Sequence, residues 1–274
     1  MMKKTGIRLA LLLALALAGV AQAQTFTADA SALRGPKTLK GGFNWLRLAN
    51  TTDRPAYAQL FRMKPGASLA AVQTASAKMG GEHGDHAASL LQVAEGYGGG
   101  GMNPKGALRL GVTLPAGRYA LWVTLEGTDS GPEKSLWATF EVTGTGAAAP
   151  RADQVIRLVD YGFALPALKP GRQLWEVRNQ GPNIHHLLVF RLAPGKTYAD
   201  YQAWEKDMQG PPPIEWPLAA NVEILSKGVS NFVEIDLKPG NYVVTCHISD
   251  PNTKRMHSEL GMTAPLTVPR EPGR

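Results

Sequence analysis

The sequence predicts an all-β protein made of two tandem β-sandwiches, each with a short helical insertion. The chain of 274 residues contains 30 Gly and 20 Pro, which favours turn-rich β structure over helical bundles. Each half contains several short strand-like runs separated by turns with Pro or Gly. The helix-like segments do not alternate with the strands, and this argues against an α/β fold.

The first 23 residues predict a cleaved export signal. Lys3, Lys4 and Arg8 form a basic region, residues 9–20 form an apolar run, and Ala21-Gln22-Ala23 fits the small-x-small rule for cleavage. The apolar run is too short to span a bilayer and no second one follows, so we expect no membrane span. We therefore expect an exported protein, periplasmic or extracellular, that is cleaved after position 23.

The charge of the chain indicates no nucleic-acid partner. The formal net charge of +7 falls to +4 when the three basic residues of the signal are removed, and the remaining charge is spread along the chain. We find no run of Arg and Lys with interleaved aromatic residues, which is the pattern that nucleic-acid binding favours.

In the first half, residues 24–146, the stretch Phe43–Gly66 contains two strand-like runs around a polar turn. Residues 68–79 have the apolar spacing of a helix. The Gly-rich stretch 96–106 predicts a loop that can pass close to another part of the molecule. Further strands are predicted at 107–113, 118–126 and 137–142.

The second half, residues 152–268, repeats this plan after a linker at 147–151 and before a tail at 269–274. The 17 residues NQGPNIHHLLVFRLAPG from Asn179 align with NTTDRPAYAQLFRMKPG from Asn50 without a gap. VEIDLKPGNYVVTCHI, which begins at Val233, aligns with LGVTLPAGRYALWVTL, which begins at Leu110. Two matched blocks in the same order indicate a tandem duplication. We predict strands at 155–160 and 173–178 and a helical piece at 198–208.

Five residues of the second half offer ligands for a soft metal ion: His185, His186, Cys246, His257 and Met262. Thiolate, imidazole and thioether groups are the ligands of a trigonal His2Cys site with a weak axial Met, the arrangement of blue-copper centres. The cysteine is the only one in the chain. It cannot form an intramolecular disulfide, and burial or metal binding protects such a thiol in an oxidising compartment.

These candidate ligands do not recur in the first half. Cys246 aligns with Val123, and His185 aligns with Ala56. The asymmetry suggests that one copy bears a site and the other is structural.

At these residues the chain resembles the cupredoxins, the plastocyanin and azurin family. The matching elements are an Asn-x-Gly turn at Asn179 before a histidine, Pro239-Gly240-x-Tyr before Cys246, then His257 and Gly-Met at 261–262. The resemblance covers 152–268 and reaches 24–146 only through the repeat. It implies a Greek-key sandwich with one type 1-like copper in the C-terminal domain, and electron transfer without substrate chemistry.

Two points of the predicted site stay open. Counting along the family pattern selects His185 as the first histidine ligand, whereas strand alternation with Leu188 selects His186. Ten residues separate Cys246 from His257, more than is typical of the family, so we expect this loop to be less constrained. His247 points away from Cys246 by alternation, and we expect it to be solvent-facing or hydrogen-bonded.

The expected function is electron transfer or copper handling with a redox partner protein; the oligomeric state stays open. The alternative is a metal-free β-sandwich that serves as a binding or scaffold protein of the cell envelope. Two-domain copper nitrite reductases resemble this layout, but they need a second, histidine-only copper site that no His cluster here clearly supplies. We therefore expect no enzymatic activity.

Overall fold

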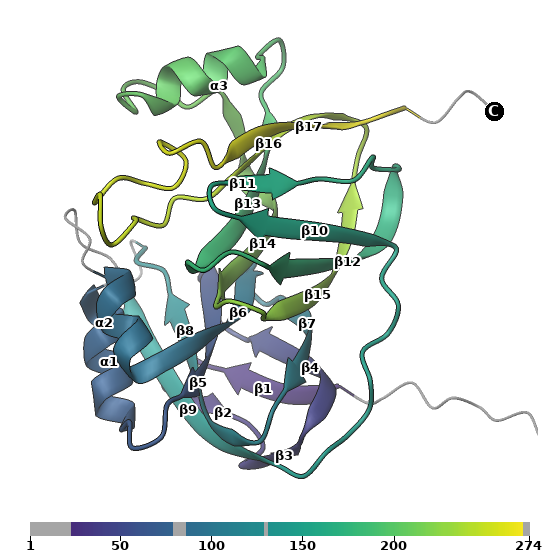
Figure 1. Cartoon of the computed structure of the whole chain (residues 1–274). Helices are drawn as coiled ribbons and strands as arrows, with labels where there is room; N and C mark the ends of the chain where they lie inside the picture. The colour runs from purple at the N-terminus through teal and green to yellow at the C-terminus, as the bar shows by residue number, and fades with distance from the viewer. Residues whose placement is uncertain (1–22, 79–85, 129–130, 271–274) are drawn as a thin grey trace, which may run out of the picture.

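The computed structural model describes residues 23–78, 86–128 and 131–270, and the predicted export signal lies outside them except for Ala23. The chain is mostly β, with two mixed sheets and short helices (Figure 1). The elements of the first half are β1 (Gln24–Ala28), β2 (Leu33–Arg34), β3 (Thr38–Lys40), β4 (Gly42–Asn50), β5 (Ala56–Met63), α1 (Leu69–Ala77), α2 (His86–Val93), β6 (Ala94–Met102), β7 (Ala107–Leu114), β8 (Gly117–Leu125) and β9 (Lys134–Thr143). The elements of the second half are β10 (Gln154–Val159), β11 (Gly162–Ala164), β12 (Gly171–Asn179), β13 (His185–Leu192), α3 (Tyr198–Glu205), β14 (Ile214–Leu225), β15 (Ser230–Leu237), β16 (Gly240–Thr245) and β17 (Thr263–Val268).

Both sheets run through both halves of the chain. One has the strand order β11-β10-β12-β15-β7-β4-β1-β2, and the other has the order β17-β16-β13-β14-β6-β5-β8-β9-β3. The halves meet through the antiparallel pairs β7–β15 and β6–β14. In each pair a strand of the first half meets the strand that occupies the same place in the second half.

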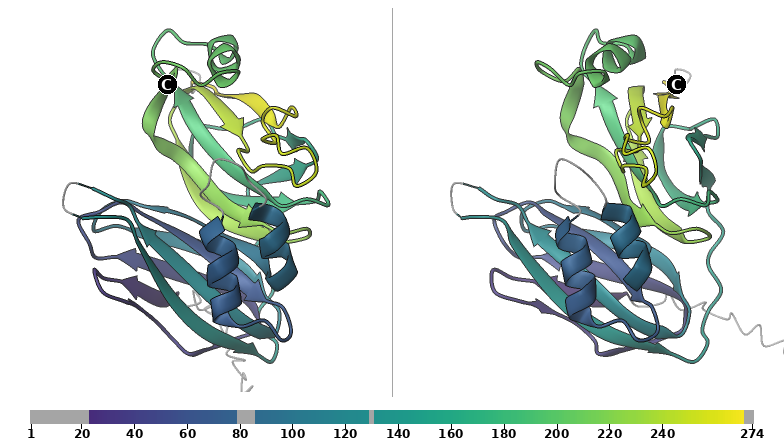
Figure 2. Two further views of the ribbon diagram at one scale, coloured as in Figure 1. Left: turned by 90° about the vertical axis from the view of Figure 1, so that its left-hand side faces the viewer. Right: turned by 60° about the vertical axis from the view of Figure 1, so that its left-hand side comes forward.

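The main core lies between the two sheets and draws buried side chains from both halves, among them Leu46, Leu110, Trp175 and Val189. Helices α1 and α2 lie side by side on the first half (Figure 2), where they pack against β5 and β8 through Val72, Leu90 and Phe61. Ile184, next to a candidate ligand, belongs to this second cluster. The first half therefore helps to bury the part of the second half that carries the donors.

The helices begin where their polar residues can cap them. Ser68 accepts a hydrogen bond from the backbone N–H of Ala71 at the start of α1, and Thr197 forms a capping box with Asp200 at the start of α3. Both helices end earlier than the sequence spacing predicts, at Ala77 and Glu205. Among the described residues we find no helix with the length and hydrophobicity to cross a membrane.

Composition predicts a loop at 96–106, but only 103–106 lie outside the strands; the stretch up to Met102 belongs to strand β6, at the junction of the halves. Its glycines leave room for neighbouring chain: a Cβ at Gly98 would lie 1.7 Å from Asn231 Oδ1, and one at Gly96 would lie 2.6 Å from the carbonyl oxygen of Ile224. Gly98 also has a φ of +79°. The expected close approach is thus present, but it occurs within a paired strand.

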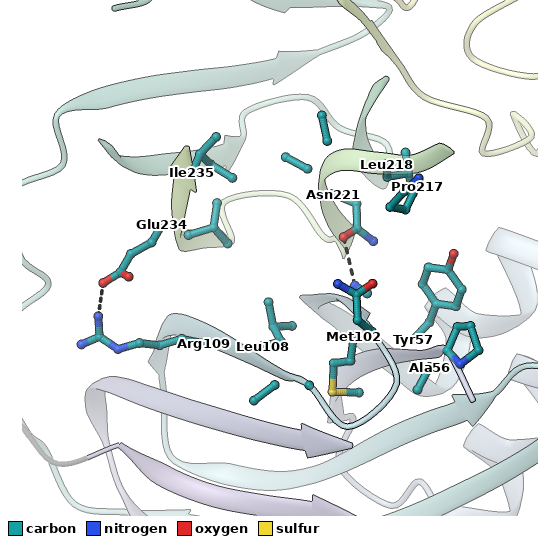
Figure 3. Close-up of a pocket in the computed structure, with 18 of the residues that line it drawn as sticks. Ala56, Tyr57, Met102, Leu108, Arg109, Pro217, Leu218, Asn221, Glu234 and Ile235 are labelled. Carbon is teal, nitrogen blue, oxygen red and sulfur yellow. Dashed lines mark hydrogen bonds and ion pairs between the residues drawn. The ribbon is translucent and has the colours of Figure 1, made fainter. Parts of the chain in front are cut away.

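A cleft of about 1160 Å³ lies at the same junction (Figure 3). Tyr57, Arg109, Trp216, Asn221 and Glu234 are among the residues that line it. Arg109 is ion-paired with Glu234, and Asn221 accepts a hydrogen bond from the backbone N–H of Gly101 at 2.9 Å. None of the five predicted metal ligands lines this cleft.

Candidate metal centre

His185 is positioned by a tight turn between β12 and β13. The side chain of Asn179 donates to the carbonyl oxygens of Asn183 at 2.7 Å and Leu225 at 2.8 Å, and it accepts from the N–H of Gly181 at 2.9 Å. This buried amide fixes the backbone just before β13, and His185, the first residue of that strand, is fully buried. The Asn-x-Gly turn noted in the sequence is therefore the element that aims this ring.

Cys246 follows directly after β16, which ends at Thr245. Its N–H donates to the carbonyl oxygen of Met262 at 3.1 Å, and its carbonyl oxygen accepts from the N–H of Ser258 at 2.9 Å. The cysteine is thus held by the segment that carries the other two candidate ligands, and not by the strand ladder.

The loop from Cys246 to His257 is well tied, contrary to the expectation of a less constrained loop. Asp250 Oδ1 accepts hydrogen bonds from the N–H groups of Asn252 and Thr253 at 3.1 and 2.7 Å. The N–H of His257 donates to the carbonyl oxygen of Ile248 at 2.8 Å, which closes the loop. An aspartate that accepts from the next turn is a common way to fix a loop, so the extra residues form their own turn and return the chain to the cysteine.

His185, Cys246 and His257 converge in one buried group. The ligand atoms of the three side chains all lie within 4.8 Å of one another. The Nδ1 atoms of the two histidines are 3.1 Å apart, and Nδ1 of His257 lies 3.5 Å from Sγ of Cys246. Met262 is fully buried in the same core cluster as Cys246, and its N–H donates to the carbonyl oxygen of His257 at 2.8 Å.

His186 and His247 lie outside this group. Nε2 of His186 accepts a hydrogen bond from the N–H of His247 at 2.7 Å. Nε2 of His247 lies 3.1 Å from the hydroxyl of Tyr201 and 3.4 Å from Oε1 of Glu205. His186 contributes to the centre only through its backbone, whose N–H lies 3.5 Å from Sγ of Cys246. The geometry thus places His185, rather than His186, among the converging donors, and it gives His247 hydrogen-bonding partners.

Burial keeps the donors neutral in the absence of a cation. It raises the pKa of the Cys246 thiol to about 12, against the opposing hydrogen bond from His186. It lowers the pKa of His257 to about 4, with a further lowering from His185. It also lowers the pKa of His185, although Asp160 opposes this shift. Each neutral imidazole keeps a free electron pair that can bind a metal ion. A bound cation stabilises the thiolate of the buried cysteine and so favours loss of the thiol proton.

Two residues beside the centre carry no motif in the sequence. Oδ1 of Asp160 lies 2.5 Å from Nε2 of His185. The ring of Tyr161 lies beside the ring of His257, with 4.8 Å between centroids, and its hydroxyl donates to Asp250 at 2.6 Å. They stand at the turn after β10, and only the tertiary structure brings that turn to the donors.

The donor set fits copper. Two imidazole nitrogens and one sulfur face one another in a dry site, and a thioether residue is buried in the same cluster. Soft sulfur ligands combined with imidazoles select copper over the hard cations, which prefer oxygen. No carboxylate belongs to the converging group in the described part of the chain.

No protein-family model matches the chain. No curated protein matches it either.

Several solved structures can be superposed on parts of the chain, at low sequence identity. Auracyanin B is 22% identical, with a TM-score of 0.29, over 45% of this chain and 94% of that chain. A multicopper oxidase from Campylobacter jejuni is 12% identical, with a TM-score of 0.27, over 91% of this chain and 64% of that chain. A copper-containing nitrite reductase from Thermus scotoductus is 12% identical, with a TM-score of 0.24, over 88% of this chain and 57% of that chain.

The fold and the converging donors of the chain itself are the basis for assigning its class. Two β-sheets enclose a common core, and His185, Cys246 and His257 of the second half converge, with Met262 five residues after His257. The resemblance to the cupredoxins is confirmed in this sense: the residues that carry the motif are brought together by a β fold.

Proposed function

We propose that this chain is an exported copper protein that transfers electrons or handles copper in the cell envelope. Its second half would hold one copper ion through His185, Cys246 and His257, with Met262 as a further sulfur ligand. The observation that carries the proposal is the convergence of the three fully buried donors within 4.8 Å. Buried polar side chains are normally paired by hydrogen bonds. In this buried group the two imidazoles and the thiol instead face one another, as the ligands of a metal ion do.

The finer architecture belongs to the same proposal. We propose two tandem Greek-key cupredoxin-like domains, at 24–146 and 152–268, of which only the second holds metal. The repeated strand order in both sheets supports this division. Export, with cleavage after Ala23, places the protein in the periplasm or outside the cell. There the one cysteine is safe from oxidation as a buried ligand.

A bound copper ion supplies one-electron redox chemistry. The protein contributes the donor atoms, their orientation and the exclusion of water. The turn at Asn179 aims His185, while the backbone bonds among Cys246, Ser258 and Met262 hold the sulfur and the second histidine together.

We propose no substrate chemistry, because the converging donors are enclosed. His185, Cys246 and His257 are each 0% exposed, so a substrate has no direct access to the metal. A redox partner protein would exchange electrons across the covering residues.

The proposal is tested by copper stoichiometry. Native mass spectrometry of residues 24–274 after loading with copper should show one ion per chain, and none in Cys246→Ser. Thr245→Ser, which changes a neighbouring buried residue that offers no soft ligand, should keep one ion. A wild type that takes up no copper would overturn the proposal and favour the metal-free scaffold, whereas one ion in both the wild type and Cys246→Ser would overturn the proposed ligands.

A further inference from the structure

The turn after β10 carries a carboxylate that no motif in the sequence marks. Oδ1 of Asp160 lies 2.5 Å from Nε2 of His185, on the side of the ring opposite the converging donors. A carboxylate can only accept, so Nε2 of His185 carries the proton and donates. Nδ1 of the same ring then has a free electron pair, and it is this atom that lies 3.1 Å from Nδ1 of His257.

The carboxylate is itself held through both of its oxygens. Nδ2 of Asn183 donates to the second oxygen, Oδ2, at 2.5 Å. Gly181 leaves the space in which the pair meets: a Cβ there would lie 2.2 Å from Oδ1 of Asp160 and 2.9 Å from Nε2 of His185. Any side chain at Gly181 would therefore push the two groups apart. The turn before β13 is thus built around this contact as well as around the histidine.

We propose that Asp160 is the positioning residue of the metal centre: it fixes His185 as the tautomer that presents Nδ1 to the metal and strengthens that nitrogen as a donor. A hydrogen-bonded carboxylate behind a ligating imidazole orients the ring and raises its basicity. A more basic, anion-backed ligand favours the copper ion of higher charge. We therefore expect Asp160 to increase copper affinity and to lower the reduction potential. This inference rests on the proposed copper function, but its first test needs no metal.

The first test is the tautomer of His185 in the metal-free protein, read by nitrogen–proton correlation of the imidazole rings. The wild type should show a protonated Nε2 and a free Nδ1. Asp160→Asn should keep this tautomer, because the amide oxygen still accepts. Asp160→Ala and Gly181→Ala should shift the ring toward the Nδ1-protonated form, the first by removing the acceptor and the second by displacing it.

The second test separates geometry from charge in the copper-loaded protein. Asp160→Ala should raise the copper dissociation constant about 10- to 100-fold, the usual loss when a residue behind a metal ligand is removed. Asp160→Asn should keep most of the affinity but raise the reduction potential, because only the charge is lost. Glu205→Gln is the matched control: it removes a buried charge that bonds Tyr201 and Thr245 instead of a ligand histidine, so it should shift the potential less.

The outcomes distinguish this inference from the proposed function. If Asp160→Ala binds copper with the same His185 tautomer, copper affinity and reduction potential as the wild type, Asp160 is not a positioning residue. If Asp160→Asn and Glu205→Gln shift the potential equally, the effect is charge at a distance, and the inference fails. If the tautomer depends on Asp160 but no variant binds copper, the contact is upheld and the copper function is wrong.

Discussion

At the scale of single residues, the direction of a side chain decides which of two adjacent histidines serves the centre. His185 and His186 are neighbours at the start of β13, and they face opposite sides. Nδ1 of the first approaches His257, whereas Nε2 of the second accepts from the backbone of His247. We therefore expect the two residues to respond very differently to substitution.

His185→Ala should abolish copper binding, because it removes one of two imidazole donors. His186→Ala should keep one copper per chain and lose about 1–3 kcal/mol of unfolding free energy, since the N–H of His247 loses its acceptor. Copper content by mass spectrometry and urea denaturation measure the two effects. Loss of copper in His186→Ala, with copper retained in His185→Ala, would reverse the assignment.

A second prediction at this scale concerns pH. Burial holds the pKa of His257 at about 4, below its ordinary value of 6.5. Between these values the unfolded chain binds more protons than the folded chain, so the unfolding free energy of the metal-free protein should fall as the pH drops from 6.5 toward 4. Denaturation at several pH values measures the slope. His257→Gln should flatten it, and an unchanged slope in that variant would contradict the account.

The donors are predictable from sequence because their identities and spacing are chemical signals on the chain. Asp160 is not predictable, since it lies 25 residues before His185 and only the pairing of β10 with β12 brings it near. A lone acidic residue at the end of a strand is ordinary in sequence. Its role depends on the 2.5 Å contact, which is a property of the tertiary structure.

At the scale of elements, the loop between β16 and β17 turns an unusual spacing into a fixed geometry. Asp250 Oδ1 accepts from two backbone N–H groups and from the hydroxyl of Thr253. The sequence correctly indicates a turn at 250–252, but the spacing alone does not reveal that the turn closes on itself. It is this closure that brings His257 back to Cys246.

Asp250→Ala should loosen this loop. We expect a loss of about 1–3 kcal/mol in unfolding free energy, because several backbone donors lose their acceptor, together with faster amide exchange at Asn252 and Thr253. Asp29→Ala is the matched control: Asp29 Oδ1 accepts from the N–H groups of Ser31 and Ala32 in a similar turn far from the donors. If both variants weaken copper binding equally, the loop has no special part in holding the site.

At the scale of the whole molecule, the two halves share sheets and core. The pairs β6–β14 and β7–β15 join them, and the main core cluster contains residues of both. The internal repeat predicts two similar halves, yet it cannot say how they meet, because the pairing edges look like ordinary strands or, for β6, like a loop. We expect the halves to unfold together.

Calorimetry should show one transition with equal calorimetric and van't Hoff enthalpies. Gly98→Ala should destabilise this cooperative unit by more than about 1 kcal/mol, because the new Cβ meets Asn231 across the junction. Gly66→Ala is the matched control: it has a similar φ of +80° but no neighbour within 4 Å. Two separate transitions, or equal losses in both variants, would contradict a shared core at the junction.

The central claim is that the thiolate of Cys246 binds copper, and the visible absorption spectrum of residues 24–274 titrated with Cu(II) tests it most directly. The account predicts an intense thiolate-to-copper charge-transfer band that saturates at one copper per chain and is absent from Cys246→Ser. A titration without such a band, in a protein whose Cys246 stays unreactive to thiol reagents, would contradict the account and leave a buried structural cysteine.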